Sequence, residues 1–323
     1  MLRLSLMALS LSVALCGFIS NVEARELKLG HNMTETHAQH KGMMLFADLL
    51  KEKSGGKLTL KVFPNGQLGS ERDQAEQVIT GALDMAKING SLAEAFEPNL
   101  GVMSIPFLFR NEEHMKNFML SDVAKELIES SRGKGFIGLT LYDAGSRSFY
   151  AKKPILKPED LNGLKMRVPE SKMMMNMVSL LGGQPTPMSW SEIYTGLQQG
   201  VIDGAENSVS SIVEMRHAEI CKHYSKNEHT MTPDIVFISE ATWGSLSADE
   251  QKWVREASRE SLVAQIKFWE EGESANVEKA KQMGVTFHEV DKAPFREKTK
   301  PIIEEIMKNP VLGGFVTKIQ NIK

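Results

Sequence analysis

Cysteine is almost absent from this chain: only Cys16 and Cys221 occur among its 323 residues. Cys16 lies in an apolar run near the start, so a chain cleaved after Ala24 retains Cys221 alone. A single thiol excludes an intrachain disulfide, and the fold must rest on its hydrophobic core. We expect Cys221 to be a buried, unreactive thiol. Lipid attachment to Cys16 is an alternative, although Leu15 is bulkier than lipoprotein processing usually tolerates.

Long hydrophobic runs are also missing after the first two dozen residues. Residues 4–19 are apolar with interspersed serines, Arg3 precedes them, and residues 22–24 offer small side chains at the usual cleavage positions. No other stretch reaches the ~18 apolar residues that a transmembrane helix needs. The sequence therefore predicts a signal peptide over residues 1–24 and a soluble periplasmic protein.

The chain lacks a strong excess of charge, since 38 basic and 41 acidic residues give a net charge of -3. This balance argues against nucleic acid or an anionic membrane surface as a partner. Enzyme signatures are missing too: there is no G-x-S-x-G, no G-x-x-x-x-G-K-[ST] and no H-E-x-x-H. His37 and His40 could share a helix face, but no carboxylate or thiol is placed to complete a metal site. We therefore expect no cofactor and no metal, and place both histidines on a partly exposed helix surface.

The pattern that is present alternates strands and helices. Residues 26–30 and 57–63 read as strands, and residues 34–53 between them have helical periodicity. Strand, helix and strand with short links form a βαβ unit, which implies a parallel sheet and a right-handed crossover. A second helix is predicted over residues 67–79, with Gly81 just past its end.

Two segments of the chain resemble each other. Residues 80–86 read Thr-Gly-Ala-Leu-Asp-Met-Ala, and residues 199–205 read Gln-Gly-Val-Ile-Asp-Gly-Ala. Gly81 and Gly200 would each end a helix that a short strand follows. The repeat suggests two related domains of an α/β protein.

A long helix is predicted near the end of the chain. Residues 247–250 form a capping box, and the helical pattern that follows reaches Met283. About 37 residues would extend about 55 Å, which is longer than one small domain, so this helix should run along both. We predict the division into residues 25–144 plus 233–272 for domain I and residues 145–232 plus 273–323 for domain II.

Arg167 belongs to a short strand. Leu164, Met166 and Val168 alternate toward one face, Arg167 lies on the other, and Pro169 ends the strand. An arginine at the end of a parallel strand is well placed to bind a carboxylate in a cleft. The pattern alone nevertheless favours a solvent-exposed arginine.

Several segments together resemble a known family. They are residues 63–69 (FPNGQLG), residues 105–109 (IPFLF) and residues 158–207, which contain GLKMRVP, PTPMSWSEIY and DGAEN in that order. Over nearly the whole mature chain the sequence resembles the substrate-binding proteins of tripartite ATP-independent periplasmic (TRAP) transporters, of the DctP and SiaP type. The resemblance implies a two-domain periplasmic binding protein fold with a ligand cleft and a long domain-spanning helix. It also implies a monomeric receptor, not an enzyme, which works with TRAP membrane subunits.

The resemblance implies a set of binding residues. Arg167 would form the main salt bridge with a substrate carboxylate, Arg147 matches the second arginine of the sugar-acid branch, and Asn207 matches an amide that helps hold the carboxylate. Further contacts in that branch fall on Asn32, Glu71, Asn89, Trp190 and His229. We add His31 as a polar group of the first domain that would face the arginines across the cleft. Closure would occur about hinges near Ala144 and Pro233.

The same comparison of residues favours a small sugar acid. Sialate receptors have a glutamate where this chain has Asn89, and a phenylalanine where it has Trp190. We therefore expect a hexuronate, such as D-glucuronate or D-galacturonate. Trp190 could equally be a core anchor or a flat wall for a sugar ring.

Three alternatives remain open at this point. The first is a receptor of the same family for sialate or another organic acid. The second is a periplasmic enzyme acting on sugar acids, for which Glu71 with His31 is the one candidate acid/base pair. The third is a metallochaperone.

Overall fold

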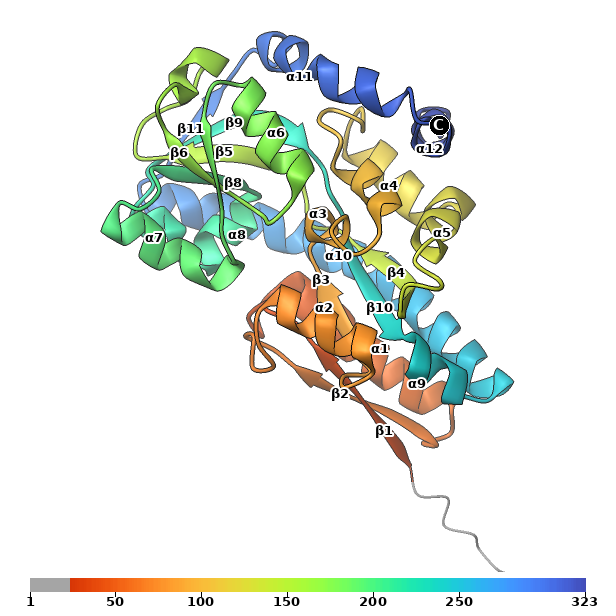
Figure 1. Ribbon diagram of the computed structural model, residues 1–323. Coiled ribbons are helices and arrows are strands. Elements are labelled where there is room, and N and C mark those ends of the chain that lie inside the picture. The colour runs from red at the N-terminus through yellow and green to blue at the C-terminus, as the bar shows by residue number, and fades with distance from the viewer. Residues whose placement is uncertain (1–23) are drawn as a thin grey trace, which may run out of the picture.

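The computed structural model describes residues 24–323, so the predicted signal peptide lies outside the described residues except for Ala24. These residues form two lobes, each built around one β-sheet with helices packed on it (Figure 1). The strand order is β2-β1-β3-β10-β4 in the first sheet and β11-β9-β5-β8-β6-β7 in the second. This is the two-domain α/β fold that the sequence predicts.

The first lobe contains most of the N-terminal half of the chain. Its elements are β1 (Arg25–Gly30), α1 (Ala38–Lys53), β2 (Leu58–Phe63), α2 (Glu71–Thr80), β3 (Met85–Ile88), α3 (Gly90–Ala93), η1 (Pro98–Ser104), α4 (Glu112–Leu120), α5 (Asp122–Glu129) and β4 (Phe136–Tyr142). The chain returns to this lobe with β10 (Asp234–Ser239) and α9 (Glu240–Ser245).

The second lobe follows β4. Its elements are β5 (Arg147–Ala151), η2 (Pro158–Leu161), β6 (Lys165–Val168), α6 (Lys172–Leu180), β7 (Gln184–Pro187), η3 (Trp190–Glu192), α7 (Ile193–Gln199), β8 (Gly204–Asn207), α8 (Val209–Glu214), η4 (His217–Glu219) and β9 (His223–Thr230). The chain ends with α10 (Ala248–Gln282), β11 (Thr286–Glu289), α11 (Ala293–Ile306) and α12 (Pro310–Gln320).

The two sheets share one topology. In the first, β1 pairs in parallel with β2 and β3, and β10 joins β3 antiparallel. In the second, β6 pairs in parallel with β7 and β8, and β5 joins β8 antiparallel. Each lobe thus has two parallel crossovers and one antiparallel strand beside the last of them. That strand, β10, comes from a distant part of the chain in the first lobe, whereas β5 directly precedes β6 in the second.

The internal sequence repeat marks equivalent turns of the two sheets. Gly81 (φ 80°) and Gly200 (φ 73°) end α2 and α7 in the left-handed conformation, which a side chain would strain. The aspartates of the repeat act alike as well. Asp84 accepts from the backbone N–H of Lys28 at 2.9 Å, and Asp203 accepts from that of Lys165 at 2.8 Å. Each aspartate therefore joins its helix-to-strand turn to the neighbouring strand.

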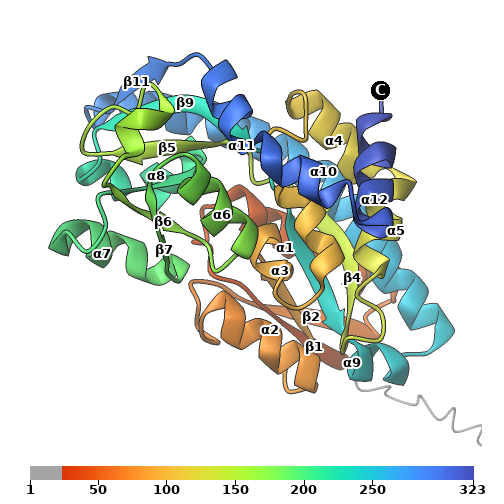
Figure 2. The same ribbon diagram turned by 45° about the horizontal axis from the view of Figure 1, so that its top comes forward.

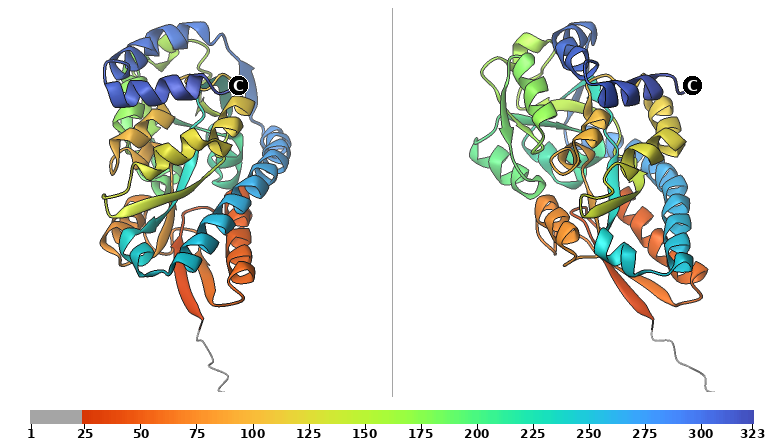
Figure 3. Two further views of the ribbon diagram at one scale, coloured as in Figure 1. Left: turned by 90° about the vertical axis from the view of Figure 1, so that its right-hand side faces the viewer. Right: turned by 45° about the vertical axis from the view of Figure 1, so that its right-hand side comes forward.

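Helix α10 extends along both lobes, as the sequence predicts (Figure 3). Ser247 and Glu250 form the predicted capping box at its N-terminus. The helix packs against α1 of the first lobe and then against α8 of the second. Ten of its residues are buried, the first being Val254 and the last Ala280. Among residues 24–323, no helix combines the length and apolar composition needed to span a membrane.

Short crossings at residues 143–146 and 231–233 also join the lobes. Gly145 in the first crossing has φ 72°, and a Cβ built there would lie 2.6 Å from the Trp269 ring. Only glycine fits both the backbone conformation and this close approach. The crossings contain the predicted hinges Ala144 and Pro233; movement about them stays a prediction.

The C-terminal helices divide between the lobes. Helix α11 packs on α6 of the second lobe, whereas α12 lies beside α5 and η1 of the first (Figure 2). Phe315, Val316 and Ile319 enter the hydrophobic core of the first lobe. The predicted division of the chain stays a prediction. It assigns α12 to domain II, and in the structure the apolar face of α12 packs on the first lobe.

Two local expectations can be compared with the structure. Cys221 is buried as expected, and burial raises the pKa of its thiol to about 12. The helix predicted from residue 34 begins later, because the side chain of His37 caps it by accepting from the backbone N–H of Gln39. That cap places His37 at the edge of the cleft instead of on an exposed helix face.

Candidate ligand-binding site

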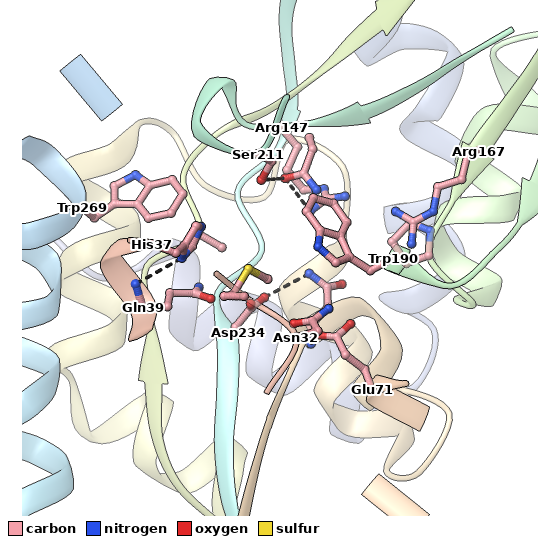
Figure 4. A pocket seen from close by; sticks show the side chains of 15 residues that line it. Asn32, His37, Gln39, Glu71, Arg147, Arg167, Trp190, Ser211, Asp234 and Trp269 are labelled. Carbon is pink, nitrogen blue, oxygen red and sulfur yellow. Dashed lines mark hydrogen bonds between the residues drawn. The ribbon is translucent and has the colours of Figure 1, made fainter. Parts of the chain in front are cut away.

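A pocket of about 410 Å³ lies between the lobes (Figure 4). The first lobe supplies strand ends and helix starts, and the second supplies the ends of β5, β6 and β8. This position follows from the topology, since the carboxyl ends of parallel strands meet at one edge of a sheet. Its lining residues are Asn32, Met33, His37, Gln39, Glu71, Asn89, Ala144, Arg147, Arg167, Pro169, Trp190, Asn207, Ser211, Asp234 and Trp269.

Arg167 is a buried cation at one end of the pocket. It lies on β6, between β7 and β8, and is only 4% exposed, so the expectation of a solvent-exposed arginine is wrong. Its Nε and Nη2 atoms donate to the carbonyl of Met188 at 2.9 and 2.7 Å. No carboxylate in the described part of the chain forms an ion pair with it. Burial lowers the pKa of Arg167 to about 10, which still leaves the guanidinium charged at neutral pH.

Arg147 is also buried, but its charge is balanced. Its Nε and Nη2 atoms donate to the two carboxylate oxygens of Glu206 at 2.7 and 2.8 Å. His229 Nε2 lies 3.2 Å from the same carboxylate. Burial would raise the pKa of Glu206, but the charge of Arg147 and the hydrogen bond from His229 hold it at about 2. Arg147 therefore retains only Nη1 for other partners.

Asn207 presents its amide nitrogen to the pocket. Its Oδ1 atom accepts from Arg147 Nη1 at 3.3 Å, from the backbone N–H of Ser208 at 2.8 Å and from Ser211 Oγ at 3.0 Å. These three donors identify the oxygen and leave Nδ2 free to donate. Arg167 and Asn207 Nδ2 together offer hydrogen-bond donors here, as an anion requires.

The first lobe presents a cluster with an excess of acceptors. Lys87 is completely buried and donates to Asp234 at 2.8 Å, Glu71 at 3.2 Å and Asn32 at 3.2 Å. Asn89 binds the same carboxylates, through its backbone N–H to Glu71 at 3.1 Å and its amide to Asp234 at 3.0 Å. Burial lowers the pKa of Lys87, but the two carboxylates reverse this and raise it. Two carboxylates around one ammonium leave oxygen lone pairs for ligand hydroxyls.

Aromatic side chains bound the pocket at two ends. The ring of Trp190 lies 5.9 Å from the Arg167 guanidinium, and its Nε1 has no hydrogen-bond partner among the described residues. His37 packs edge-on against Trp269, with ring centroids 5.6 Å apart. Since His37 Nδ1 accepts from Gln39, its proton lies on Nε2. Burial lowers the pKa of His37 to about 3, so the ring is neutral.

The structure brings seven of the nine predicted site residues to this pocket: Asn32, Glu71, Asn89, Arg147, Arg167, Trp190 and Asn207. The other two lie behind it. His31 is buried between the backbone N–H of Met33 and the ring of His40, and His229 is buried behind Glu206. Both therefore support wall residues without lining the pocket. A direct ligand contact of His31 or His229 stays a prediction, since neither side chain lines the pocket.

Five functional candidates escape the sequence patterns: His37, Gln39, Lys87, Asp234 and Trp269. For Lys87 the sequence does contain an indication of function, because it is the single charged residue of the buried strand β3. Asp234 follows Pro233 at a crossing, and Trp269 lies in the middle of a long helix, so neither is near the other site residues in sequence. Only tertiary contacts bring them to the cleft.

The acid/base pair of the enzyme alternative does not form. Glu71 accepts from Lys87 and the backbone of Asn89, whereas His31 Nε2 is 3.0 Å from His40 Nδ1. Burial lowers the pKa of His31 to about 2, so it does not exchange a proton near neutral pH. Within residues 24–323, no group of three or more His, Cys, Asp or Glu side chains is arranged to hold a metal ion.

The chain is similar to known solute-binding proteins over most of its length. The family model of bacterial extracellular solute-binding proteins, family 7 (DctP), matches residues 29–309. The protein YiiZ of Salmonella typhimurium, described as uncharacterized, is 38% identical over 277 residues, which cover 85% of each chain.

Solved structures agree with this match. A TRAP periplasmic solute-binding protein from Xanthobacter autotrophicus, crystallised with bound β-D-galacturonate, is 37% identical with a TM-score of 0.90. The alignment covers 92% of this chain and 100% of that one. A second such protein, from Anaerococcus prevotii with bound D-glucuronate, is 36% identical with a TM-score of 0.89 and covers 92% and 97% of the two chains.

Proposed function

Because the chain belongs to the bacterial extracellular solute-binding proteins of family 7, we propose that it is the receptor of a TRAP transporter for a hexuronate, such as D-glucuronate or D-galacturonate. It binds the sugar acid outside the cytoplasm and delivers it to the membrane subunits. The N-terminal sequence pattern supports export to the periplasm with cleavage after Ala24.

The observation that carries this proposal is the unpaired charge of Arg167. Burying a cation without an anion is costly, so proteins normally pair such a group. Arg147, 20 positions earlier on the neighbouring part of the sheet, is matched by Glu206. Among residues 24–323, the only hydrogen-bond partner of Arg167 is a carbonyl, and Arg167 lines the pocket. A ligand carboxylate supplies the missing charge, and Asn207 Nδ2 donates to the same group.

The opposite wall fits the rest of a sugar acid. Ligand hydroxyl groups can donate to Glu71 and Asp234, which Lys87 holds in place, and can accept from Asn32. Trp190 provides a flat apolar surface for the C–H face of the sugar ring beside the carboxylate site.

Matched pairs of ligands test this function. Isothermal titration calorimetry should show tight binding of glucuronate or galacturonate and no measurable binding of glucose or galactose at the same concentrations. The neutral hexoses have the same ring but leave Arg167 without a counter-charge. Equal affinity for glucose and glucuronate would contradict the proposal. Tighter binding of sialate than of any uronate would move the ligand to another branch of the same family.

The enzyme alternative makes a separate prediction. A receptor leaves the uronate chemically unchanged, so NMR spectra of ligand incubated with the protein should stay constant over a day. Conversion of a uronate at a rate that depends on protein concentration would support an enzyme instead.

A further inference from the structure

Gln39 lies at the end of the pocket away from Arg167, beside His37 and Trp269 (Figure 4). It belongs to the first turn of α1 and is 0% exposed. Its Nε2 atom donates to the carbonyl of Asp143 at 3.0 Å. Its Oε1 atom has no hydrogen-bond partner among the described residues. One half of the amide is therefore satisfied and the other half is not.

The orientation of this amide is fixed by its neighbours. The carbonyl of Asp143 also accepts from Gln265 Nε2 at 2.9 Å, and the N–H of Asp143 donates to Gln265 Oε1 at 2.7 Å. Helix α10 thus holds the Asp143 peptide in place. Turning the Gln39 amide over would set its oxygen against a carbonyl oxygen, which is repulsive. The oxygen must remain the unpaired atom.

A buried acceptor without a donor destabilises the protein, and such atoms usually indicate a partner. The carboxylate site at Arg167 supplies only donors, so the ligand offers hydroxyl groups to the far end. We propose that Gln39 Oε1 accepts a hydrogen bond from one hydroxyl group of the bound sugar acid and selects ligands that carry it. This inference rests on the proposed function, and it names a residue that reads the hydroxylated end of the ligand.

The same side chain connects the ligand to the crossing between the lobes. Gln39 belongs to the first lobe, and Asp143 opens the 143–146 crossing to the second. Asp143 Oδ1 also accepts from the backbone N–H of Gly145 at 2.8 Å. A hydroxyl on Oε1 therefore joins a continuous set of hydrogen bonds that ends at the crossing. The Gln39 amide would therefore contact both the ligand hydroxyl and the crossing between the lobes.

The chain contains a matched control for this residue. Gln74 is also 0% exposed, its Nε2 donates to a backbone carbonyl (Gly69) at 2.8 Å, and its Oε1 has no partner among the described residues. It lies in α2 of the same lobe but does not line the pocket. The two glutamines therefore differ in whether the residue with the unpaired oxygen lines the pocket.

Calorimetry with the preferred hexuronate tests the inference. Gln39→Met keeps the approximate shape but removes the acceptor, and should lower affinity about 5- to 150-fold, the range for leaving a polar partner unsatisfied. Gln74→Met should bind within twofold of wild type. Mono-deoxy uronates, each lacking one hydroxyl group, complete a double-mutant cycle between Gln39 and the ligand. One of them should bind wild type more weakly than the parent sugar acid, yet bind Gln39→Met as well as the parent does.

The other possible outcomes contradict the inference about Gln39, and they can be distinguished from a failure of the proposed function. If Gln39→Met binds like wild type while Arg167→Ala does not bind, the function stands and the role of Gln39 is wrong. If every deoxy analogue loses the same factor in both proteins, a trapped water, and not the ligand, satisfies Oε1. If Gln39→Met does not fold, equal binding of all deoxy analogues to wild type is sufficient to reject the proposal. Failure of wild type to bind any hexuronate overturns the proposed function and this inference together.

Discussion

Lys87 and Glu206 are equivalent residues of the two lobes, 119 positions apart (206 minus 87), and they carry opposite charges. Each is the third residue of its strand, β3 or β8, and each is completely buried. Each is neutralised by the first residue of the adjacent antiparallel strand, Asp234 on β10 or Arg147 on β5. The register is the same in both sheets, because the partner lies two residues from the one directly opposite.

This relationship explains the charge of the cleft. In the first lobe, Glu71 adds a second carboxylate to the Lys87 pair, so formal charges sum to -1. In the second lobe, Arg167 adds a second cation to the Glu206 pair, so they sum to +1. The lobes thus face each other with complementary charge, and we expect an anionic ligand to occupy the positive side.

Arg167→Ala should abolish high-affinity binding of the hexuronate. Loss of a buried charge partner typically costs about 2–5 kcal/mol, which is roughly 30- to several-thousand-fold in affinity. Arg167→Lys should also bind poorly, since an ammonium lacks the planar pair of donors. Calorimetry measures both, with Arg296→Ala as a control outside the pocket. A loss below threefold for Arg167→Ala would show that the ligand carboxylate lies elsewhere.

Glu206→Gln should destabilise the whole protein and not only the site. It leaves Arg147 buried without a counter-charge, and breaking such a pair costs about 3–5 kcal/mol of unfolding free energy. The control is Glu289→Gln, which breaks an exposed pair with Lys226 and should cost less than about 1 kcal/mol. Urea unfolding monitored by circular dichroism compares them. Equal effects of the two substitutions would mean that burial does not determine how much the Arg147–Glu206 pair contributes to the unfolding free energy.

Asp143 should make stability depend on pH. Burial raises the pKa of its carboxyl from 3.8 to about 7, so between these values the folded protein holds a proton that the unfolded chain has released. Its contribution to stability is therefore fully present below about pH 4 and is lost as the pH rises toward 7. The slope is at most about 1.4 kcal/mol per pH unit.

Asp143→Asn removes this titration. The unfolding free energy of the variant, relative to wild type, should increase from pH 4 to pH 7 and then become constant. Urea unfolding at four pH values measures the difference, and Asp249→Asn, at the exposed start of α10, controls for loss of any one carboxylate. A difference that does not change with pH would show that Asp143 is ionised in the folded protein throughout.

Ligand binding should compact the protein. Several contacts join the lobes directly. Among them, Thr34 donates to Glu214 at 3.0 Å, the backbone N–H of Met173 donates to Glu94 at 3.0 Å, and Arg72 pairs with Glu170. Solution scattering should give a smaller radius of gyration with saturating hexuronate than without it.

Variants of the two walls should separate binding from closure. Glu71→Gln should weaken binding and leave the complex more open, because that wall supplies the closing contacts. Arg167→Ala should prevent ligand-dependent compaction. Identical scattering curves for wild type with and without ligand would contradict a hinged receptor.

Local rules were enough to predict much of the architecture. The capping box at Ser247 fixed the start of α10, since its side-chain hydrogen bonds involve residues three positions apart. Gly81 and Gly200 marked two helix ends, because a left-handed residue is a local requirement. Helix α12 could not be assigned to a lobe in this way. Its apolar face is readable from the sequence, but the sequence does not say which core that face covers.

The sequence by itself determined the βαβ order of the elements, the long helix and the motif around Arg167, because these depend on neighbours along the chain. Only the tertiary structure decided which charges are matched. Glu206 neutralises Arg147 from 59 positions away and Asp234 neutralises Lys87 from 147, whereas Arg167 has no carboxylate partner in the described residues. Pairing across strands depends on sheet order and register, which local patterns do not encode. The unpaired arginine and the unpaired oxygen of Gln39 are therefore properties of the fold.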